Sequence, residues 1–253
     1  MDTRYWGPSG WRLLHLISFS DAPKRKEVEA FFNTLAYVLP CKYCRKSFSE
    51  NITKDPIEKA DSLPEWLWRM HNRVNAKLRA QKLCTARNPT FQAVKSVYTE
   101  RLEAGCTRTT FEGWEFIFSI AEGHPLSRQG RSSVPISGHP DLQTLIEPLE
   151  RNRWNVMAPE ERMKPYREFW LLLPKVLPFP EWSAAWKGGS ATPTANRRDL
   201  LKHLWSARCE LESKLDLLNR TSYNSLCREL QSHRSGCAKS VRGKTCRKKR
   251  AAT

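Results

Sequence analysis

Two cysteines spaced two residues apart, Cys41 and Cys44, are the side chains of this sequence that most directly suggest chemistry. A C-x-x-C pair can ligate a metal ion, can cycle between a dithiol and a disulfide, or can lie unreactive in a core. A structural zinc site needs four ligands, normally from a second pair of similar spacing. The other cysteines and histidines form no second C-x-x-C pair and no His-x-x-x-His stretch, so no metal site is predicted. On the pair alone, a redox role and an unreactive role both stay open.

The position of the pair favours a reactive thiolate. Pro40 ends an apolar helical pattern over 26–38, so Cys41 falls in a turn and the residues after it can open the next helix. Amide N–H groups and the helix dipole stabilise a thiolate at a helix N-terminus. Three basic side chains add positive charge nearby: Lys42, Arg45 and Lys46.

Apolar residues recur at helical spacing through residues 1–106 and predict an all-α fold. Trp11, His15 and Phe19 fall on one face of the first predicted helix. Pro8 and Ser9 mark the predicted start of that helix. The predicted helices cover 9–19, 26–38, a segment opening at 42–51, 63–81 and 89–104. Short loops join them, which is typical of a compact four-helix bundle, here with a short fifth helix.

The composition changes after residue 106, and we predict a separate, mostly helical domain over 107–238. A stretch rich in Gly, Ser and Pro interrupts this part at 124–140. Helical patches follow at 141–154, 159–173 and 196–218, without strand-like alternation or an internal repeat. No motif in this second part indicates a role.

The chain has a formal net charge of +17, and its last residues, 239–253, are strongly basic. Such a tail is usually solvated and disordered, but it can also contact nucleic acid through its charge. No apolar run is long enough to cross a bilayer, so no membrane contact is predicted. The N-terminus lacks the basic and apolar regions of a secretory signal.

Three motifs appear in order within the first 80 residues: "WGPSGWRLLH" at 6–15, "LPCKYC" at 39–44 and "WLWRMHNRVNAKL" at 66–78. Together they resemble the Erv/ALR family of FAD-linked sulfhydryl oxidases, most closely those of large DNA viruses. The resemblance covers residues 5 to about 100 and leaves the second part of the chain unexplained.

The resemblance implies a helical bundle that holds FAD beside the redox pair. Carried over by position, the cofactor-binding residues would be Gly7, Pro8, Trp11, His15, Phe19, His71, Asn72, Asn75, Lys77 and Phe91. Aromatic rings suit a flat cofactor, Asn and His side chains can bond its ring edges, and a lysine can meet its phosphates. Taken singly, Trp11, Phe19 and His15 would more often be core residues.

The resemblance also implies an activity. Cys41 and Cys44 would form disulfides in protein dithiol substrates, and the electrons would pass to FAD and then to molecular oxygen, giving hydrogen peroxide. Cys41 would be the more exposed sulfur and meet the substrate, whereas Cys44 would lie next to the flavin. By the same resemblance we expect a homodimer, and a location in the host cytoplasm or the virion.

The sequence departs from the family pattern at several positions. Phe19 stands where relatives often have tyrosine, and Trp68 stands where cellular relatives have the first cysteine of a structural disulfide. Cys84 lies near the second position of that bridge and is predicted to stay free. Cys237 and Cys246 could form an electron-relaying pair on the tail or be incidental. A competing reading is a non-catalytic module that binds nucleic acid or protein and has a structural C-x-x-C pair.

Overall fold

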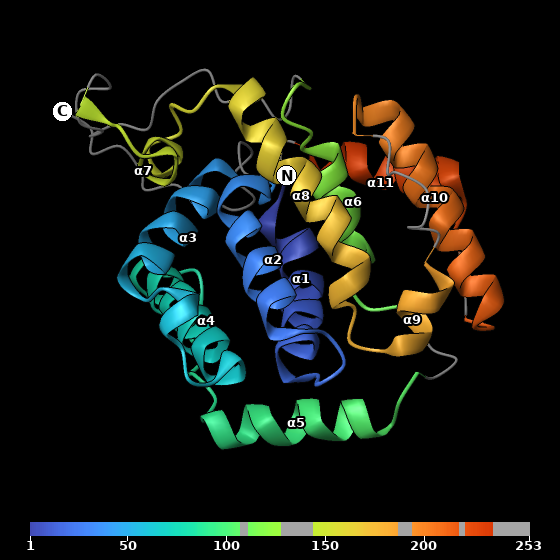
Figure 1. Cartoon of the computed structure of the whole chain (residues 1–253), viewed down its shortest axis with the longest axis horizontal. Helices are drawn as coiled ribbons and strands as arrows, with labels where there is room; N and C mark the ends of the chain where they lie inside the picture. Colours follow the sequence, from blue (N-terminus) through green and yellow to red (C-terminus); the bar gives the residue numbers. More distant parts are fainter. Residues whose placement is uncertain (107–110, 128–143, 187–193, 218–220, 235–253) are drawn as a thin grey trace.

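The computed structural model describes residues 1–106, 111–127, 144–186, 194–217 and 221–234, and every regular element among them is helical (Figure 1). This confirms the predicted all-α class. The first part contains α1 (Thr3–Phe19), α2 (Arg25–Val38), α3 (Lys42–Lys54), the 3-10 helix η1 (Ile57–Lys59), α4 (Leu63–Ala80) and α5 (Phe91–Glu103). The second part contains α6 (Trp114–Glu122), α7 (Pro148–Arg153), α8 (Pro159–Val176), α9 (Pro180–Ala185), α10 (Arg197–Lys214) and α11 (Tyr223–His233).

The first helix begins earlier than the sequence predicts. Asp2 is its N-cap, and the Asp2 carboxylate accepts a hydrogen bond from the backbone N–H of Arg4 at 2.9 Å. Pro8, predicted to mark the start, lies inside α1. Proline cannot donate to the carbonyl four residues earlier, but the buried face of the helix outweighs this loss. The later starts follow the prediction more closely, since Ser62 caps α4 and Thr90 caps α5 through their hydroxyl groups.

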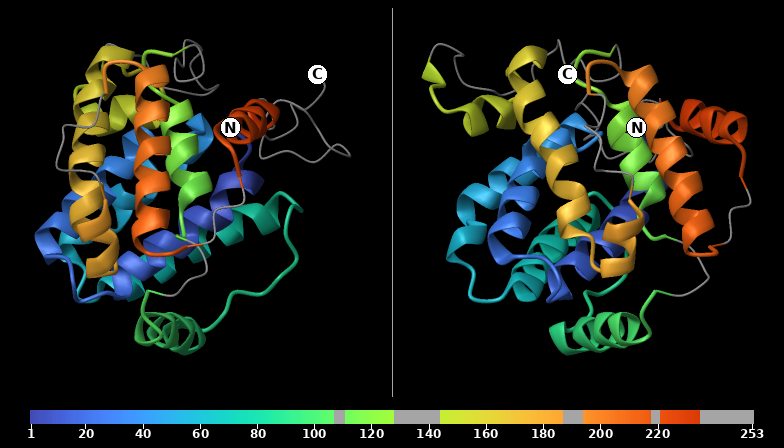
Figure 2. Two further views of the ribbon diagram at one scale, coloured as in Figure 1. Left: turned by 90° about the vertical axis from the view of Figure 1, so that its right-hand side faces the viewer. Right: turned by 45° about the vertical axis from the view of Figure 1, so that its right-hand side comes forward.

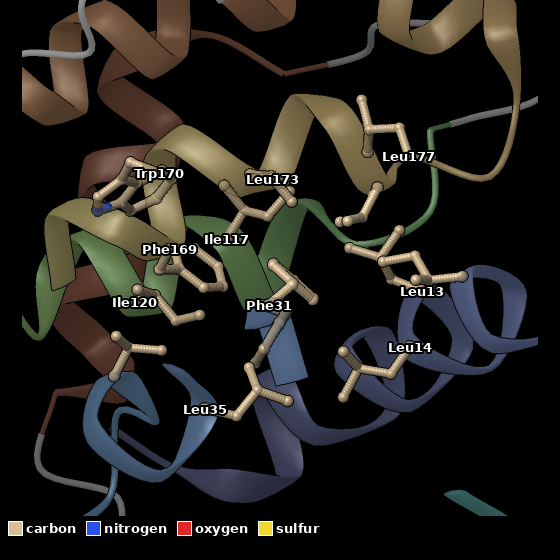
Figure 3. Packing of buried hydrophobic residues seen from close by; sticks show 14 of the residues in the cluster. Leu13, Leu14, Phe31, Leu35, Ile117, Ile120, Phe169, Trp170, Leu173 and Leu177 are labelled. Atoms are coloured by element: carbon tan, nitrogen blue, oxygen red, sulfur yellow. The ribbon is translucent and has the colours of Figure 1, made fainter. Parts of the chain in front are cut away.

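Helices of the second part pack directly on those of the first. The most extensive helix contact in the described residues joins α2 to α8, and α6 lies along α1 (Figures 1 and 2). Figure 3 shows Phe31 of α2 facing Phe169 of α8, with ring centroids 5.1 Å apart. Ile117 of α6 lies in the same buried cluster. The predicted boundary at residue 106 therefore falls within one buried cluster and does not separate two cores.

The close approach of α6 to α1 depends on a glycine. A methyl group at Gly10 would lie 2.9 Å from the ring of Phe116, nearer than real side chains come. The turn before α6 also needs a glycine, because Gly113 has φ +118° and lies against the side chain of Leu13. These two glycines allow α6 to cover one face of α1. Another face of α1 contacts α4 and α5.

α5 lies apart from this core, across the edge of the bundle (Figure 1). It contacts α1 and α4, and none of its residues is buried. Among the described residues, no helix combines the length and the apolar character needed to span a membrane.

Candidate redox and cofactor site

The cysteine pair occupies the start of α3, as the sequence predicts. Cys41 is the N-cap residue, and the backbone N–H of Cys44 donates to the carbonyl of Cys41 at 3.0 Å. Both sulfurs therefore belong to the first turn of a helix, where amide groups favour the anionic form of a thiol. We call residues 39–45 the redox turn.

The exposure of the two cysteines is the reverse of the expectation. Cys41 is only 5% exposed and belongs to the buried cluster, whereas Cys44 is half-buried. The second part of the chain packs on both neighbours of Cys41. The Asn155 side chain donates from Nδ2 to the carbonyl of Lys42 at 3.1 Å, and the backbone at Gly123 lies against Pro40. The prediction that Cys41 is the more exposed sulfur was wrong because it treated the oxidase-like part as if nothing else packed on it.

A set of rings from α1, α4 and α5 forms the second half of the site. Trp11 and His71 stack with ring centroids 3.9 Å apart and planes within 7°. Tyr98 stacks on His15 at 4.9 Å and lies 5.7 Å from Phe19. We call the whole set the aromatic group: Trp11, His15, Phe19, His71, Phe91 and Tyr98. The predicted aromatic positions are thus brought together across three helices.

Tyr98 is the member that the sequence analysis missed. It follows Phe91 by seven residues, which places the two side chains on the same face of α5 two turns apart. Phe91 stacks on Phe19 at 6.2 Å, so both aromatic residues of α5 meet the stripe on α1. The spacing within α5 could have indicated Tyr98 once Phe91 was singled out.

The two histidines of the aromatic group are neutral at physiological pH. His15 Nε2 and His71 Nδ1 lie 3.2 Å apart, which requires one ring to donate and the other to accept. Burial lowers the pKa of His15 to about 3, with a further contribution from His71, and burial lowers the pKa of His71 to about 4. His15 Nδ1 is buried and has no hydrogen-bond partner among the described residues. An unprotonated imidazole with one unused nitrogen is suited to a polar group of a ligand.

Of the polar residues predicted on α4, Lys77 contacts α3. Asn72 and Asn75 are half-buried, and Lys77 is exposed. The Lys77 ammonium donates to the hydroxyl of Ser47, which lies one turn after Cys44 on α3. Lys77 therefore links α4 to α3 close to the cysteine pair. Gly7, on α1, has open space where a side chain would project.

An ion cluster at the end of α3, not singled out in the sequence, fixes the distance between α3 and α4. Asp55 pairs with Arg69 at 3.1 Å and with Arg73 at 2.9 Å. These partners lower the pKa of Asp55, chiefly through the hydrogen bond from Arg69. Trp66 adds a hydrogen bond from its indole N–H to the Asp55 carbonyl at 2.9 Å. The cluster joins the helix of the cysteine pair to the helix of His71.

The predicted departures from the family pattern have structural counterparts. The Trp68 indole N–H donates to the carbonyl of Pro89 at 3.0 Å, and its ring meets Phe91 edge to face at 5.9 Å. Trp68 therefore fastens the loop after α4 without a disulfide. Among the described residues Cys84 has no disulfide partner, as predicted, and neither has Cys106, which accepts a hydrogen bond from Trp182. Cys237 and Cys246 lie outside the described residues.

Comparisons with known proteins agree with this geometry. A family model described as "Erv1 / Alr family" matches residues 8–95. The "FAD-linked sulfhydryl oxidase" of African swine fever virus is 41% identical over 81 residues, which are 29% of this chain and 68% of that protein. The chain belongs to the Erv1 / Alr family. The matched residues include most of the three motifs. They also include every member of the aromatic group except Tyr98.

Other relatives in the Erv1 / Alr family share less. The "Mitochondrial FAD-linked sulfhydryl oxidase ERV1" of Saccharomyces cerevisiae is 33% identical over 88 residues, 32% of this chain and 47% of that protein. A "Probable FAD-linked sulfhydryl oxidase" of Acanthamoeba polyphaga mimivirus is 29% identical over 85 residues, 30% of this chain and 59% of that protein. The match thus spans about half the length of the yeast relative. No solved structure gives a significant match.

Proposed function

We propose that this chain is an FAD-dependent sulfhydryl oxidase that introduces disulfides into protein dithiols. The observation that carries the proposal is that α3, the helix of the cysteine pair, contacts α4, one of the helices that carry the aromatic group. The C-x-x-C pair opens α3, and Lys77 and the Asp55 cluster tie α3 to α4. α4 carries His71 of the aromatic group, most of whose members are half-buried. The names of the relatives support the same activity.

The chemistry of the aromatic group fits a flavin. Its rings offer flat apolar surface, and His15 Nδ1 is a buried polar atom that lacks a partner. Neutral imidazoles can donate to or accept from a ring edge, and Lys77 places a positive charge where a phosphate could meet it. The residues that would hold the cofactor are Gly7, Pro8, Trp11, His15, Phe19, His71, Asn72, Asn75, Lys77 and Phe91. Bound there, FAD would supply an acceptor for the two electrons and two protons of the reduced cysteine pair and a route for them to molecular oxygen, with hydrogen peroxide as the product.

The cysteine pair performs the thiol chemistry. A substrate thiolate attacks one sulfur of the Cys41–Cys44 disulfide, forming a mixed disulfide and releasing the other sulfur as a thiolate. A second substrate thiolate then attacks the mixed disulfide, which releases the substrate as a disulfide. Two electrons have passed from the substrate to the pair, and the start of α3 stabilises the negative charge that develops on sulfur.

The family resemblance assigns the attack to Cys41 and the flavin side to Cys44. The burial of Cys41 adds a condition to this assignment. A protein thiol reaches Cys41 only when the residues around Asn155 and Gly123 separate from the redox turn. Cys44 is half-buried and lies on the same helix as Ser47, the partner of Lys77.

The homodimer expected from the family resemblance would have to form on surfaces of the bundle that the chain itself leaves uncovered. The faces of α1 and α2 that meet α6 and α8 are already buried within the chain. α3, α4 and α5 keep outward faces, so a dimer would form there. The viral relatives support a location in the host cytoplasm or the virion. The basic residues 239–253, proposed to contact nucleic acid, lie outside the described residues.

Purified full-length protein tests the proposal. We expect a yellow preparation that absorbs at about 450 nm and consumes oxygen when dithiothreitol is added, with hydrogen peroxide as product. A colourless protein that does not bind added FAD and consumes no oxygen would overturn the proposal.

A further inference from the structure

The residue that follows the redox pair, Arg45, is buried. Its side chain is 4% exposed although it carries a guanidinium group. Nη1 donates to the carbonyl of Leu39 at 2.8 Å, so the side chain runs from the first turn of α3 back to the residue before Pro40. Nη2 donates to Oδ1 of Asn155 at 3.3 Å. The guanidinium thereby lies within the redox turn, hydrogen-bonded to Leu39 at the start of the turn and to Asn155 from the second part of the chain.

The hydrogen-bond partners of Arg45 do not balance its charge. A peptide carbonyl and a side-chain amide are neutral, Arg45 Nε has no hydrogen-bond partner, and no carboxylate among the described residues pairs with Arg45. Burying a cation without an anion is costly, which is why buried arginines usually have acidic partners. Burial lowers the pKa of Arg45, and the groups that oppose this effect are Cys41 and Cys44. The redox sulfurs are thus the anions available to this cation.

Among the described residues, the charged groups on neighbouring elements do not provide an alternative anion. From α8, the buried Arg162 faces Arg45 with the same sign of charge. On α3, Lys46 pairs with Glu50 near the surface. On α7, Arg153 pairs with Glu150. On α6, Glu122 is already paired with Arg197 of α10 and with Arg234, which follows α11.

Asn155 fixes the guanidinium through an amide whose two ends are both engaged. Oδ1 accepts from Arg45, and Nδ2 donates to the carbonyl of Lys42 at 3.1 Å. Asn155 itself has φ +56°, a conformation that asparagine tolerates better than most residues. α7 ends at Arg153, two residues before Asn155. Within α7, the buried Asn152 side chain donates a hydrogen bond to the carbonyl of Ala36 on α2. The position of Asn155 is therefore set by the packing of α7 on the bundle.

We propose that Arg45 stabilises the thiolate form of the reduced Cys41–Cys44 pair, and that Asn155 is the positioning residue that holds the Arg45 guanidinium at the redox turn. The inference rests on the proposed function, because it names the group that tunes the proposed redox pair. It also gives the second part of the chain a role in the chemistry of the first. A small residue at position 45 would leave the redox turn without this charge. A protein that lacked α7 and the residues after it would leave Arg45 without Asn155 as its hydrogen-bond partner.

The test is the pH dependence of alkylation of the reduced pair. Full-length protein is reduced, kept free of oxygen and treated briefly with iodoacetamide at a series of pH values, and labelling of the peptide that contains both cysteines is measured by mass spectrometry. Arg45→Met removes the charge and keeps a long apolar chain. In this variant we expect the midpoint of the curve of labelling rate against pH to move to higher pH, so that labelling at pH 7 is about tenfold slower. Arg45→Lys should recover part of the loss, and Asn155→Ala should give a smaller shift in the same direction.

The matched control is Lys46→Met, which removes the same charge one residue further along α3 from a side chain paired with Glu50. An unchanged midpoint in Arg45→Met and Asn155→Ala, with thermal unfolding showing that both remain folded, would overturn the proposal. An equal shift in Lys46→Met would also overturn it, since any nearby charge would then suffice. If Arg45→Met does not fold, Asn155→Ala decides. The readout requires no flavin, so failure to bind FAD would count against the proposed function and leave this result independent.

Discussion

The redox turn and the aromatic group belong to the same bundle, but different forces hold them. The redox turn is held by hydrogen bonds from a buried guanidinium and a buried amide, and part of this support comes from residues more than a hundred positions later. The aromatic group is held by ring stacking between α1, α4 and an α5 that buries none of its residues. One half of the site is tuned by charge in a closed environment, and the other is assembled at an edge of the bundle where most of its rings stay partly exposed. The cysteine half is therefore sensitive to small changes in polarity, and the ring half to changes in shape.

The largest expected effect separates the two halves outright. Cys44→Ser removes one sulfur of the pair and leaves the aromatic group intact, so the variant should keep FAD yet lose turnover by at least about a thousandfold, because no disulfide can re-form. Oxygen uptake with dithiothreitol measures the loss, and flavin absorption shows that FAD is retained. The control is Cys84→Ser, which removes a free thiol outside the pair. Normal oxygen consumption by Cys44→Ser would show that the pair is not the active one.

The support of the redox turn by the second part of the chain can be broken in the core. Phe31→Ala removes the ring that faces Phe169 between α2 and α8, and should lower the free energy of unfolding by about 3–5 kcal/mol. Urea unfolding followed by tryptophan fluorescence measures this change. If the parts share one core, the tryptophans of α8 and α9 unfold in the same shifted transition. An unchanged transition for those tryptophans would show that the parts unfold separately. Val97→Ala, on exposed α5, should change stability by less than about 0.5 kcal/mol.

The aromatic group should make stability depend on pH. The folded-state pKa values of His15 and His71, about 3 and about 4, lie below the ordinary value of 6.5. The unfolded chain therefore binds protons first as the pH falls, so the stability from these neutral rings is complete above about pH 6.5 and is lost progressively down to about pH 3. Melting temperatures measured between pH 7 and pH 4 should show this fall. His15→Gln with His71→Gln should flatten it, and an unflattened slope would place the effect elsewhere.

The smallest effect concerns the loop behind the aromatic group. Trp68→Phe keeps a ring against Phe91 but removes the hydrogen bond to the carbonyl of Pro89, and should cost about 1 kcal/mol of unfolding free energy. Trp68→Ala loses the ring contact as well and should cost more. Equal stability of both variants and the unaltered protein would show that Trp68 does not fasten this loop.

Much of the first part could be predicted because its signals are local. The helix start at Cys41 follows from Pro40, and the stripe of Trp11, His15 and Phe19 follows from helical spacing. The burial of Cys41 and Arg45 could not be predicted in this way, since it depends on Asn155, which comes from a part of the chain without a recognisable motif. The sequence indicated positive charge at position 45 but not that the charge lies inside the turn. Tyr98 could be predicted only in part. Its seven-residue spacing from Phe91 indicates the same face of the helix, but no motif marks it as a site residue.

The indole of Trp68 has one further consequence. Where cellular relatives are expected to use a covalent sulfur bridge, this chain uses a nitrogen-to-oxygen bond and an edge-to-face ring contact. Neither responds to reductants or to peroxide. The loop after α4 therefore keeps these contacts while the cysteine pair cycles between its dithiol and disulfide forms. Strong reductants can consequently be used to probe that pair without releasing the loop.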